Sequence, residues 1–365
     1  MRVFLLVCML LGATQQASYV DKGNNKGNIV DLKSNLNLNI PEHPLFLDDS
    51  KEVLGIENQP IMLPIKCTWD DSTLVRFVGL NGLPGEVLRI SNNGISVKRF
   101  GLDQKDEFKD AFIYDFTTSE DGKLHFLIQT SRKSKYPSKY FILLYSSDGV
   151  YLNHQALENE NFFARKIGVF GDGNYLISGF TKGMNSQSIT YIYNPRGQLV
   201  KEISMTQDLK DESDQDPSKR KITAQQNAEV TAKALKEVLF SSMGLLDTGE
   251  IALIRSSPKG PLYLINSGGT ARKIDLQLPE NADFITMRTG HGMVLIFFSQ
   301  TLNQYSQKYT YELIDPQTGA VKEILHANDS KMGVAVGCIG PNHIDFIGAG
   351  TKNTTLNIHH ASWSH

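Results

Sequence analysis

Two interleaved series of tight polar turns run along the chain, and they constrain its fold more than any other feature. A short apolar run such as "LHFLIQ" or "YLISGF" follows each turn of the first series. Asp-Gly and Gly-Asp pairs between such runs are typical of β-hairpins, because Gly and Asp tolerate the positive φ that tight turns need. The first series falls at Asp71, Gly122, Gly173, Gly249, Gly292 and Asn342, in steps of 51, 51, 76, 43 and 50 residues.

The second series lies between the members of the first. Each repeat therefore reads as strand, turn, strand, polar loop, strand, turn, strand. Four strands in a period of roughly 45–50 residues are typical of a β-propeller blade. The apolar runs also lack the 3.6-residue periodicity that a helical solenoid requires. The second series falls at Gly94, Gly149, Gly197, Gly269 and Gly319.

The number of turns predicts how the ring closes. The sixth repeat ends at "TTLNIHHASWSH", which supplies a third strand and no fourth, whereas residues 27–40, "GNIVDLKSNLNLNI", resemble an outer strand without a blade. A strand donated from the N-terminal end would remove exposed sheet edges. We therefore expect an all-β, six-bladed β-propeller with four-stranded blades, one domain over 27–365, closed by an N-terminal strand. Seven blades, with a degenerate one inside 30–66, are the alternative.

This combination of turn spacing and apolar alternation, with a single Trp-Asp pair at 69–70 and no Trp-Asp signature that recurs as in WD40 repeats, resembles six-bladed propellers of the TolB/NHL-like kind. The resemblance extends over nearly all of the chain after residue 27. Its motifs are turn positions and alternation, so it implies a fold and does not identify an activity.

The N-terminal segment "MRVFLLVCMLLGATQQAS" has one cation, Arg2, before an apolar run and then small residues. This order is typical of a secretory signal peptide, which we place at 1–17. No later segment reaches the roughly 18 apolar residues that a membrane-spanning helix needs. We therefore expect an exported protein, secreted or periplasmic, with no membrane span.

The charge and cysteine content of the chain bear on its partners and on a possible disulfide. The formal net charge is −2 and no stripe of Lys and Arg is visible, which argues against a nucleic-acid partner. Two cysteines remain after cleavage, Cys67 and Cys338, each four residues before a turn of the first series, in the first and last blades. A disulfide between them would lock the ring in an oxidising compartment. The alternative is two buried thiols that pack as small hydrophobic groups.

The step of 76 residues contains an insertion between the third and fourth blades, at 207–236. Its first part is a charged loop without an apolar face. Its second part predicts a surface helix over a blade edge, or alternatively a lid or docking element. The apolar stripe of this helix is predicted to consist of Ala228, Ala232, Leu235 and Leu239.

No catalytic motif is present: the chain contains neither H-E-x-x-H nor G-x-S-x-G. The best enzymatic alternative is a metal-dependent, lactonase-like hydrolase with a site at the central channel. Cations, among them Lys66 and Lys331, break up any carboxylate cage there, so we assign no metal ligands, and the sequence leaves any cofactor unknown. The channel candidates for that alternative are Asp110, Asp115, Arg165 and Asp283.

A binding role rests on the polar loops between second and third strands, which share one face of a propeller. Tyr136 and Tyr305 are the candidate aromatic anchors on that face. With Arg165 and Asp283 near the channel, they are the predicted ligand-binding residues. We expect a monomeric binding or protein-interaction module rather than an enzyme, with a protein or carbohydrate ligand.

Overall fold

The structure, a computed structural model, contains one α-helix and a 3-10 turn within its described part and is otherwise built of β-strands. The described residues are 29–32, 40–53, 61–68, 70–77, 85–94, 96–132, 134–158, 161–182, 186–203, 224–239, 241–254, 261–276, 282–303, 306–327, 329, 332, 336–349 and 356–364.

Three sheets have four antiparallel strands each, in chain order from the inside to the outside of the molecule. The first sheet consists of β3 (Ile61–Cys67), β4 (Thr73–Phe77), β5 (Glu86–Ile90) and β6 (Val97–Gly101), followed by the 3-10 turn η1 (Leu102–Gln104). The second consists of β7 (Phe112–Thr118), β8 (Leu124–Gln129), β9 (Tyr140–Tyr145) and β10 (Tyr151–Ala156). The third consists of β11 (Phe162–Val169), β12 (Tyr175–Thr181), β13 (Ser188–Tyr193) and β14 (Leu199–Ile203).

Two further sheets complete the arrangement. The fourth has β15 (Ser242–Leu245), β16 (Ile251–Ile254), β17 (Leu262–Ile265) and β18 (Ala271–Ile274), with β1 (Ile29–Leu32) added as an outer parallel strand. The last sheet has eight strands in the order β19 (Ala282–Gly290), β20 (Met293–Asn303), β21 (Ser306–Ile314), β22 (Val321–Ala327), β2 (Glu42–Val53), β25 (Leu356–Ser362), β24 (His343–Ala349) and β23 (Val336–Ile339).

The long strand β2 joins the two ends of the chain. Its first residues, Glu42–Leu45, pair in parallel with β22, and Phe46–Val53 pair antiparallel with β25. The expected closing segment, 27–40, was wrong: within it, Ile29–Leu32 form β1 and pair with β18 instead. An N-terminal strand does pair with the C-terminal strand, but it begins at residue 42.

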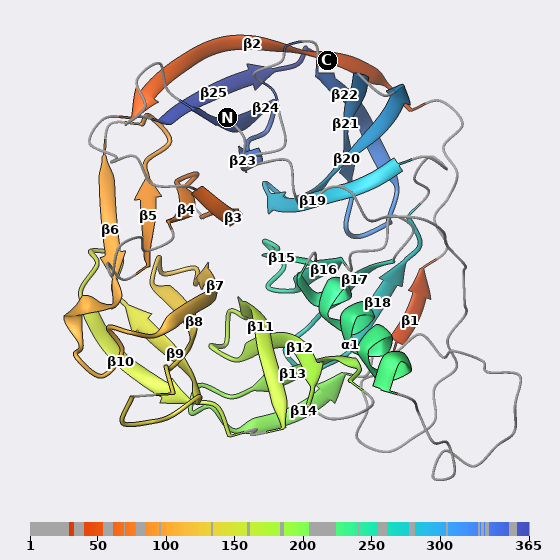
Figure 1. Cartoon of the computed structure of the whole chain (residues 1–365). Coiled ribbons are helices and arrows are strands. Elements are labelled where there is room, and N and C mark those ends of the chain that lie inside the picture. Colours follow the sequence, from red (N-terminus) through yellow and green to blue (C-terminus); the bar gives the residue numbers. More distant parts are fainter. Residues whose placement is uncertain are drawn as a thin grey trace, which may run out of the picture.

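The sheets stand around a centre like the blades of a propeller (Figure 1), with the strands β3, β7, β11, β15, β19 and β23 innermost. Adjacent inner strands contact one another around most of the ring, including β7 with β11 and β23 with β3. Side chains of these six strands therefore approach each other along the propeller axis.

Buried apolar clusters fill the spaces between neighbouring sheets. Phe100 and Phe116, for example, belong to one cluster that joins the first sheet to the second. Another cluster joins Val53 and Ile358 to Ile65, which links the eight-stranded sheet to the first sheet. The described part of the chain contains six such clusters. Burial of this kind supplies most of the favourable free energy of folding.

The hairpin turns have the backbone geometry that the sequence predicts. Among the described residues, all nine glycines with positive φ lie at positions of the two turn series, for example Gly122 with φ of 77°. Asp71, the first position of the first series, and His291, next to Gly292, also adopt positive φ, and Asp and His are among the residues that tolerate it best.

A disulfide joins Cys67 of β3 to Cys338 of β23, with 4.9 Å between the Cα atoms. The two inner strands contact each other where the eight-stranded sheet lies next to the first sheet. The bond spans 271 residues of sequence, so it links the beginning and the end of the ring covalently.

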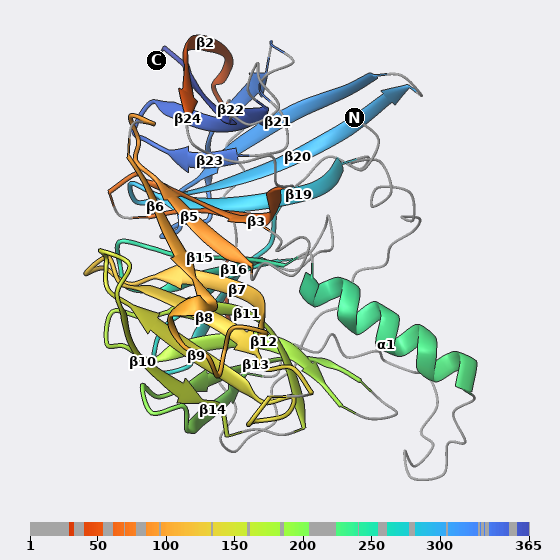
Figure 2. The ribbon, with the colours of Figure 1, turned by 60° about the vertical axis from the view of Figure 1, so that its left-hand side comes forward.

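The helix α1 (Ala224–Leu239) lies on one face of the ring, as Figures 1 and 2 show, and contacts β11, β12 and β13. Its buried side chains are Ala234 and Val238. The predicted stripe was therefore wrong in position, because Ala228, Ala232 and Leu239 are exposed. The i, i+4 spacing holds, but the stripe is rotated around an alanine-rich helix that offers more than one small apolar face.

Candidate functional site

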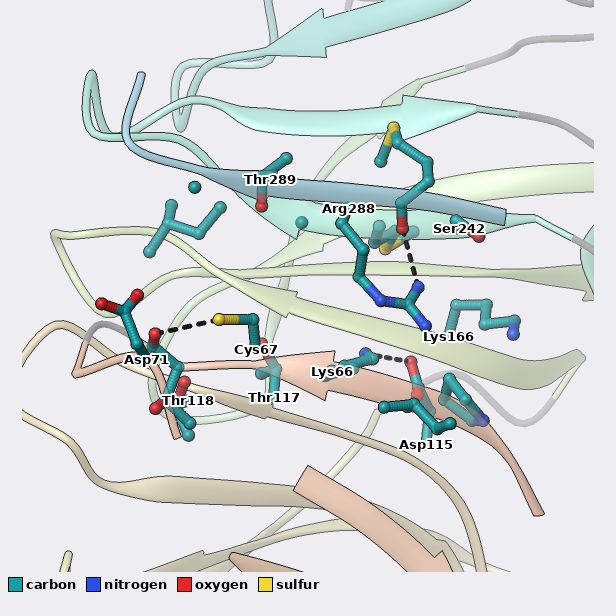
Figure 3. Close-up of a pocket in the computed structure, with 18 of the residues that line it drawn as sticks. Lys66, Cys67, Asp71, Asp115, Thr117, Thr118, Lys166, Ser242, Arg288 and Thr289 are labelled. Atoms are coloured by element: carbon teal, nitrogen blue, oxygen red, sulfur yellow. Dashed lines mark hydrogen bonds and ion pairs between the residues drawn. The ribbon is translucent and has the colours of Figure 1, made fainter. Parts of the chain in front are cut away.

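A cavity of about 290 Å³ occupies the centre of the ring. Its walls come from the inner strands β3, β7, β11, β15 and β19, and Figure 3 shows many of these side chains. The charged residues that line it are Lys66, Asp71, Asp115, Lys166, Asp247 and Arg288, together with His291. Titratable groups from several different strands therefore meet in this cavity.

Irregularities in the inner strands decide which side chains enter the cavity. The pairing of β7 with β8 shifts register between Ile113 and Asp115, and that of β11 with β12 shifts between Ala164 and Lys166. Such β-bulges add a residue to one strand and re-aim the side chains that follow. Asp115 and Lys166 are the residues that resume pairing, and both line the cavity.

Asp115 is the anionic centre of one end of the cavity. Its side chain is 0% exposed, and its Oδ2 accepts hydrogen bonds from Lys66 Nζ and from the backbone N–H of Ile167, each at 2.9 Å. Burial lowers the pKa of Lys66, and the adjacent Asp115 carboxylate opposes that effect. The second carboxylate oxygen, Oδ1, is buried without a hydrogen-bond partner among the described residues.

Arg288 of β19 enters the same end from the other side. Its Nε donates to the carbonyl of Val336 at 2.9 Å, and its Nη1 donates to Thr286 Oγ1 and to the carbonyl of Met287. Burial lowers the pKa of this guanidinium to about 9. The remaining terminal nitrogen, Nη2, has no hydrogen-bond acceptor within the described residues.

Lys166 of β11 has no counter-ion paired with it among the described residues. In the described part of the chain, its Nζ makes no hydrogen bond or ion pair. Burial lowers the pKa of Lys166 to about 8, and the charges of Lys66, Arg76 and Arg288 lower it further, against the opposing influence of Asp115. The ammonium group is therefore held close to other cations at a high free-energy cost.

We name Lys66, Arg76, Lys166 and Arg288 the channel cation cluster. Arg76 lies behind the cavity wall, where it donates to the carbonyls of Ile113 and Tyr114. Three cations of the cluster, Lys66, Lys166 and Arg288, line this end of the cavity with one carboxylate, Asp115, which leaves an excess of two positive charges there. Figure 3 shows Lys66, Lys166, Arg288 and Asp115 together at one end of the cavity.

The other end of the cavity has a different character. Asp71 and His291 lie at hairpin turns there, with His291 Nε2 3.2 Å from Asp71 Oδ1, and Asp247 is a further lining residue. Figure 3 places Asp71 away from Asp115. Acidic groups at one mouth and cations deeper inside produce an electrostatic gradient along the channel.

The predicted channel carboxylates do not come together as a metal site. Asp115 lines the cavity, but Lys66 already pairs with it. Asp110 is exposed on the surface and is not among the lining residues, and the side chain of Asp283 is not described. Divalent cations favour several oxygen ligands, whereas the donors gathered here are mostly positively charged. The residues present do not fit a hydrolytic metal ion at this place.

The predicted binding residues are dispersed. Arg165 stacks on the ring of Tyr114 at 4.1 Å and donates to the hydroxyl of Tyr140, and it does not line the cavity. Tyr136 is half-buried against Phe141, with ring centroids 5.6 Å apart. Tyr305 lies outside the described residues, as do Lys331 and the N-terminal segment 1–17.

The sequence analysis missed Lys166 and Arg288, and it treated Lys66 only as an obstacle to metal binding. The available signal was a cation in the middle of three different inner strands. A charged residue inside a strand that borders a propeller axis is costly unless a partner neutralises it.

Comparisons with known proteins concern the fold. No family model and no curated protein sequence matches the chain. Among solved structures, a protein of unknown function from Dyadobacter fermentans is similar, with 7% identity, coverage of 88% of this chain and 99% of that one, and a TM-score of 0.51.

Two other solved structures resemble the chain less closely by TM-score. They are the endosialidase of phage phi92, at 8% identity with 87% and 69% of the two chains covered and a TM-score of 0.49, and a luciferin-regenerating enzyme, at 10% identity with 86% and 95% covered and a TM-score of 0.45. At these scores they carry no argument about this chain.

Within the described residues, no helix is both long and apolar enough to cross a membrane. The chain is thus an all-β protein with a propeller arrangement of sheets and a central cavity that has three cations at one end.

Proposed function

We propose that the protein is an exported β-propeller that acts as a binding module and holds a small anion in its central channel. The observation that carries this proposal is that three cations, Lys66, Lys166 and Arg288, share the single carboxylate of Asp115 at one end of a cavity of about 290 Å³. Burying unpaired charge is costly, and a bound anion would remove most of that cost. Binding energy would therefore come from charges that the fold already holds in place.

The proposal includes a ring of six blades. The eight-stranded sheet divides into β19–β22 and β23–β25 with β2, because β2 follows β22 with its first residues and β25 with its remaining ones. Each half then has four strands, like the other sheets. The six buried clusters support the same division, since each lies between two neighbouring units.

Export rests on the sequence of residues 1–17 and on the disulfide. The Cys67–Cys338 bond is of the kind that persists in secreted and periplasmic proteins, and cytosolic thiols are normally kept reduced. Both features favour the same compartment. A reducing, cytosolic location would make the bond exceptional.

The open groups of the site define the ligand chemistry. Lys166 Nζ and Arg288 Nη2 are donors without acceptors, and Asp115 Oδ1 is an acceptor without a donor, in each case among the described residues. A small oxyanion that also carries a hydroxyl group, such as a hydroxycarboxylate or a protonated phosphate, satisfies both requirements. A purely apolar ligand satisfies neither, and a cation cannot accept from the two donors.

Thermal unfolding of the mature protein in the presence of added anions tests the proposal. Phosphate, sulfate, acetate and malate are titrated against sodium chloride at matched ionic strength, because a ligand that binds only the native state raises the transition by mass action. We expect a saturable rise with malate or phosphate, its loss in Lys166→Met, and its retention in Lys98→Met. Lys98 is a surface lysine paired with Asp148, which makes it the matched control. Absence of a saturable rise, or an equal effect of both substitutions, refutes the proposal.

A metal-dependent hydrolase in the channel is not favoured. The same charges that attract an anion repel a divalent cation, and Asp115 has no second carboxylate beside it at that end of the cavity.

A further inference from the structure

A group of two histidines and one aspartate lies away from the channel, on the sheet that closes the ring. His343 and Asp345 belong to β24 and His360 belongs to β25. One ligand atom from each residue lies within 4.8 Å of those of the other two. None of these residues lines the central cavity, so the group is separate from the anion site.

The strand pairing explains why the three side chains meet. Asp345 lies directly opposite His360 in the antiparallel ladder between β24 and β25. His343 precedes Asp345 by two residues, and in a strand such residues point to the same face. Cross-strand and i, i+2 neighbours of this kind lie within reach of each other's side chains. The arrangement is therefore set by the regular backbone and does not depend on a loop.

We propose that His343, Asp345 and His360 form a site for a divalent transition-metal ion, with zinc as the best fit. Two imidazole nitrogens and one carboxylate oxygen are borderline-soft donors that suit Zn²⁺ better than Ca²⁺ or Mg²⁺, which prefer oxygen ligands. Three protein ligands leave one tetrahedral position for water.

The distances are close to those that zinc requires. Asp345 Oδ1 lies 2.5 Å from His360 Nδ1 and 4.0 Å from His343 Nε2. Ligand atoms on a tetrahedral ion with bonds of about 2.0–2.1 Å are separated by about 3.3 Å. One contact would open and the other would close by less than 1 Å each, which side-chain rotation provides. Asp345 is 2% exposed, so its carboxylate is held in place by the sheet around it.

A second group of residues supports the far side of the His360 ring. Asp49 of β2 lies opposite His360 in the ladder between β2 and β25, and its Oδ1 is 3.8 Å from His360 Nε2. Metal-bound histidines commonly direct their other ring nitrogen toward a carboxylate, which fixes the ring orientation. Lys51 Nζ lies 3.4 Å from the same Nε2 and 3.6 Å from Asp49. Its charge is thus on the Nε2 side, away from the edge of the ring where the ion would bind.

Occupation of this site would strengthen the closure of the ring. An ion held by β24 and β25 would fix His360, which in turn contacts Asp49 of the N-terminal strand β2. Metal binding to the native state alone contributes directly to its stability. The inferred role is structural, because the site lies on the sheet in which β2 pairs with β25.

Calorimetric and thermal titration with Zn²⁺ tests the inference in the mature protein, after dialysis against EDTA and then against metal-free buffer. We expect one equivalent of Zn²⁺ to bind and to raise the unfolding transition saturably. His343→Ala is the decisive variant, since this side chain makes no close hydrogen bond among the described residues and its removal should leave the fold intact. We expect it to weaken Zn²⁺ binding at least tenfold.

The matched control is His326→Ala, which removes another half-buried histidine that lies 3.0 Å from a single carboxylate, Glu42, and belongs to no group of three ligands in the described residues. It should bind Zn²⁺ like the unmodified protein. Co²⁺ provides an independent readout, because its visible absorption band intensifies in four-coordinate sites and should be lost in His343→Ala. Absence of stoichiometric binding, or equal loss of binding in His326→Ala, overturns the inference.

Discussion

Replacement of Lys166 by methionine should make the ligand-free protein more stable. Burial and neighbouring cations lower the pKa of Lys166 from 10.5 to about 8, a displacement of about 2.5 units. At about 1.4 kcal/mol per unit, the charged ammonium costs the folded state on the order of 3 kcal/mol at neutral pH. This is an upper figure, because the side chain is partly accessible from the cavity. Methionine keeps the length of the side chain and removes the charge.

The pH dependence of the free energy of unfolding tests whether the charged Lys166 destabilises the folded protein. Between pH 8 and 10.5 the unfolded chain binds a proton at Lys166 that the folded protein has released, so the free energy of unfolding should rise with pH across this window. Anion binding should show the opposite trend and weaken as pH rises through 8. Urea-induced unfolding at pH 7 and pH 9.5 measures the first effect, and Lys166→Met should reduce the rise to the part that Lys66 and Arg288 contribute. A variant that is less stable than the unmodified protein at pH 7, or that keeps the slope, refutes the reasoning.

Three further predictions concern stability. Replacing both Cys67 and Cys338 by alanine should lower the free energy of unfolding by about 5 kcal/mol in the loop-closure model, since the loop spans 271 residues; equal urea midpoints for the two proteins would contradict this. Asp115→Asn should cost about 3–5 kcal/mol because it leaves buried cations without an anion, with the exposed Asp148→Asn, expected within about 1 kcal/mol, as the control in thermal unfolding. Val238→Asp should release α1 and increase amide exchange across it, and unchanged protection there would count against its packing on β11–β13.

The turns and the blade pattern could be predicted because each hairpin needs specific residues. Gly122, for instance, occupies a backbone conformation with φ of 77° that other residues rarely adopt. The closing strand could not be identified in this way. β2 has only two fully buried side chains, Leu45 and Val53, so it lacks the alternation by which inner strands are recognised.

The residues of the channel site could not be predicted from the alternation of polar and apolar residues either. Arg165 and Lys166 are adjacent cations, and regular pairing gives no basis for the register shift between Ala164 and Lys166. A one-residue shift exchanges the two faces of a strand. It sends Arg165 onto the ring of Tyr114 and Lys166 into the cavity. Sequence reasoning chose Arg165, the wrong member of the pair for the channel.

The position of β2 also determines when the ring can form. The residues that pair across the closure, such as Ser50 and His359, are 309 apart in the sequence. Loop-closure entropy must be overcome before such a distant contact contributes, so folds of high contact order form slowly. Residues Phe46–Val53 of β2 cannot pair with β25 until that last strand exists, although Glu42–Leu45 can pair with β22 before then. Folding is therefore completed only after the whole chain is available, and a chain truncated before residue 356 would present two open sheet edges to other molecules.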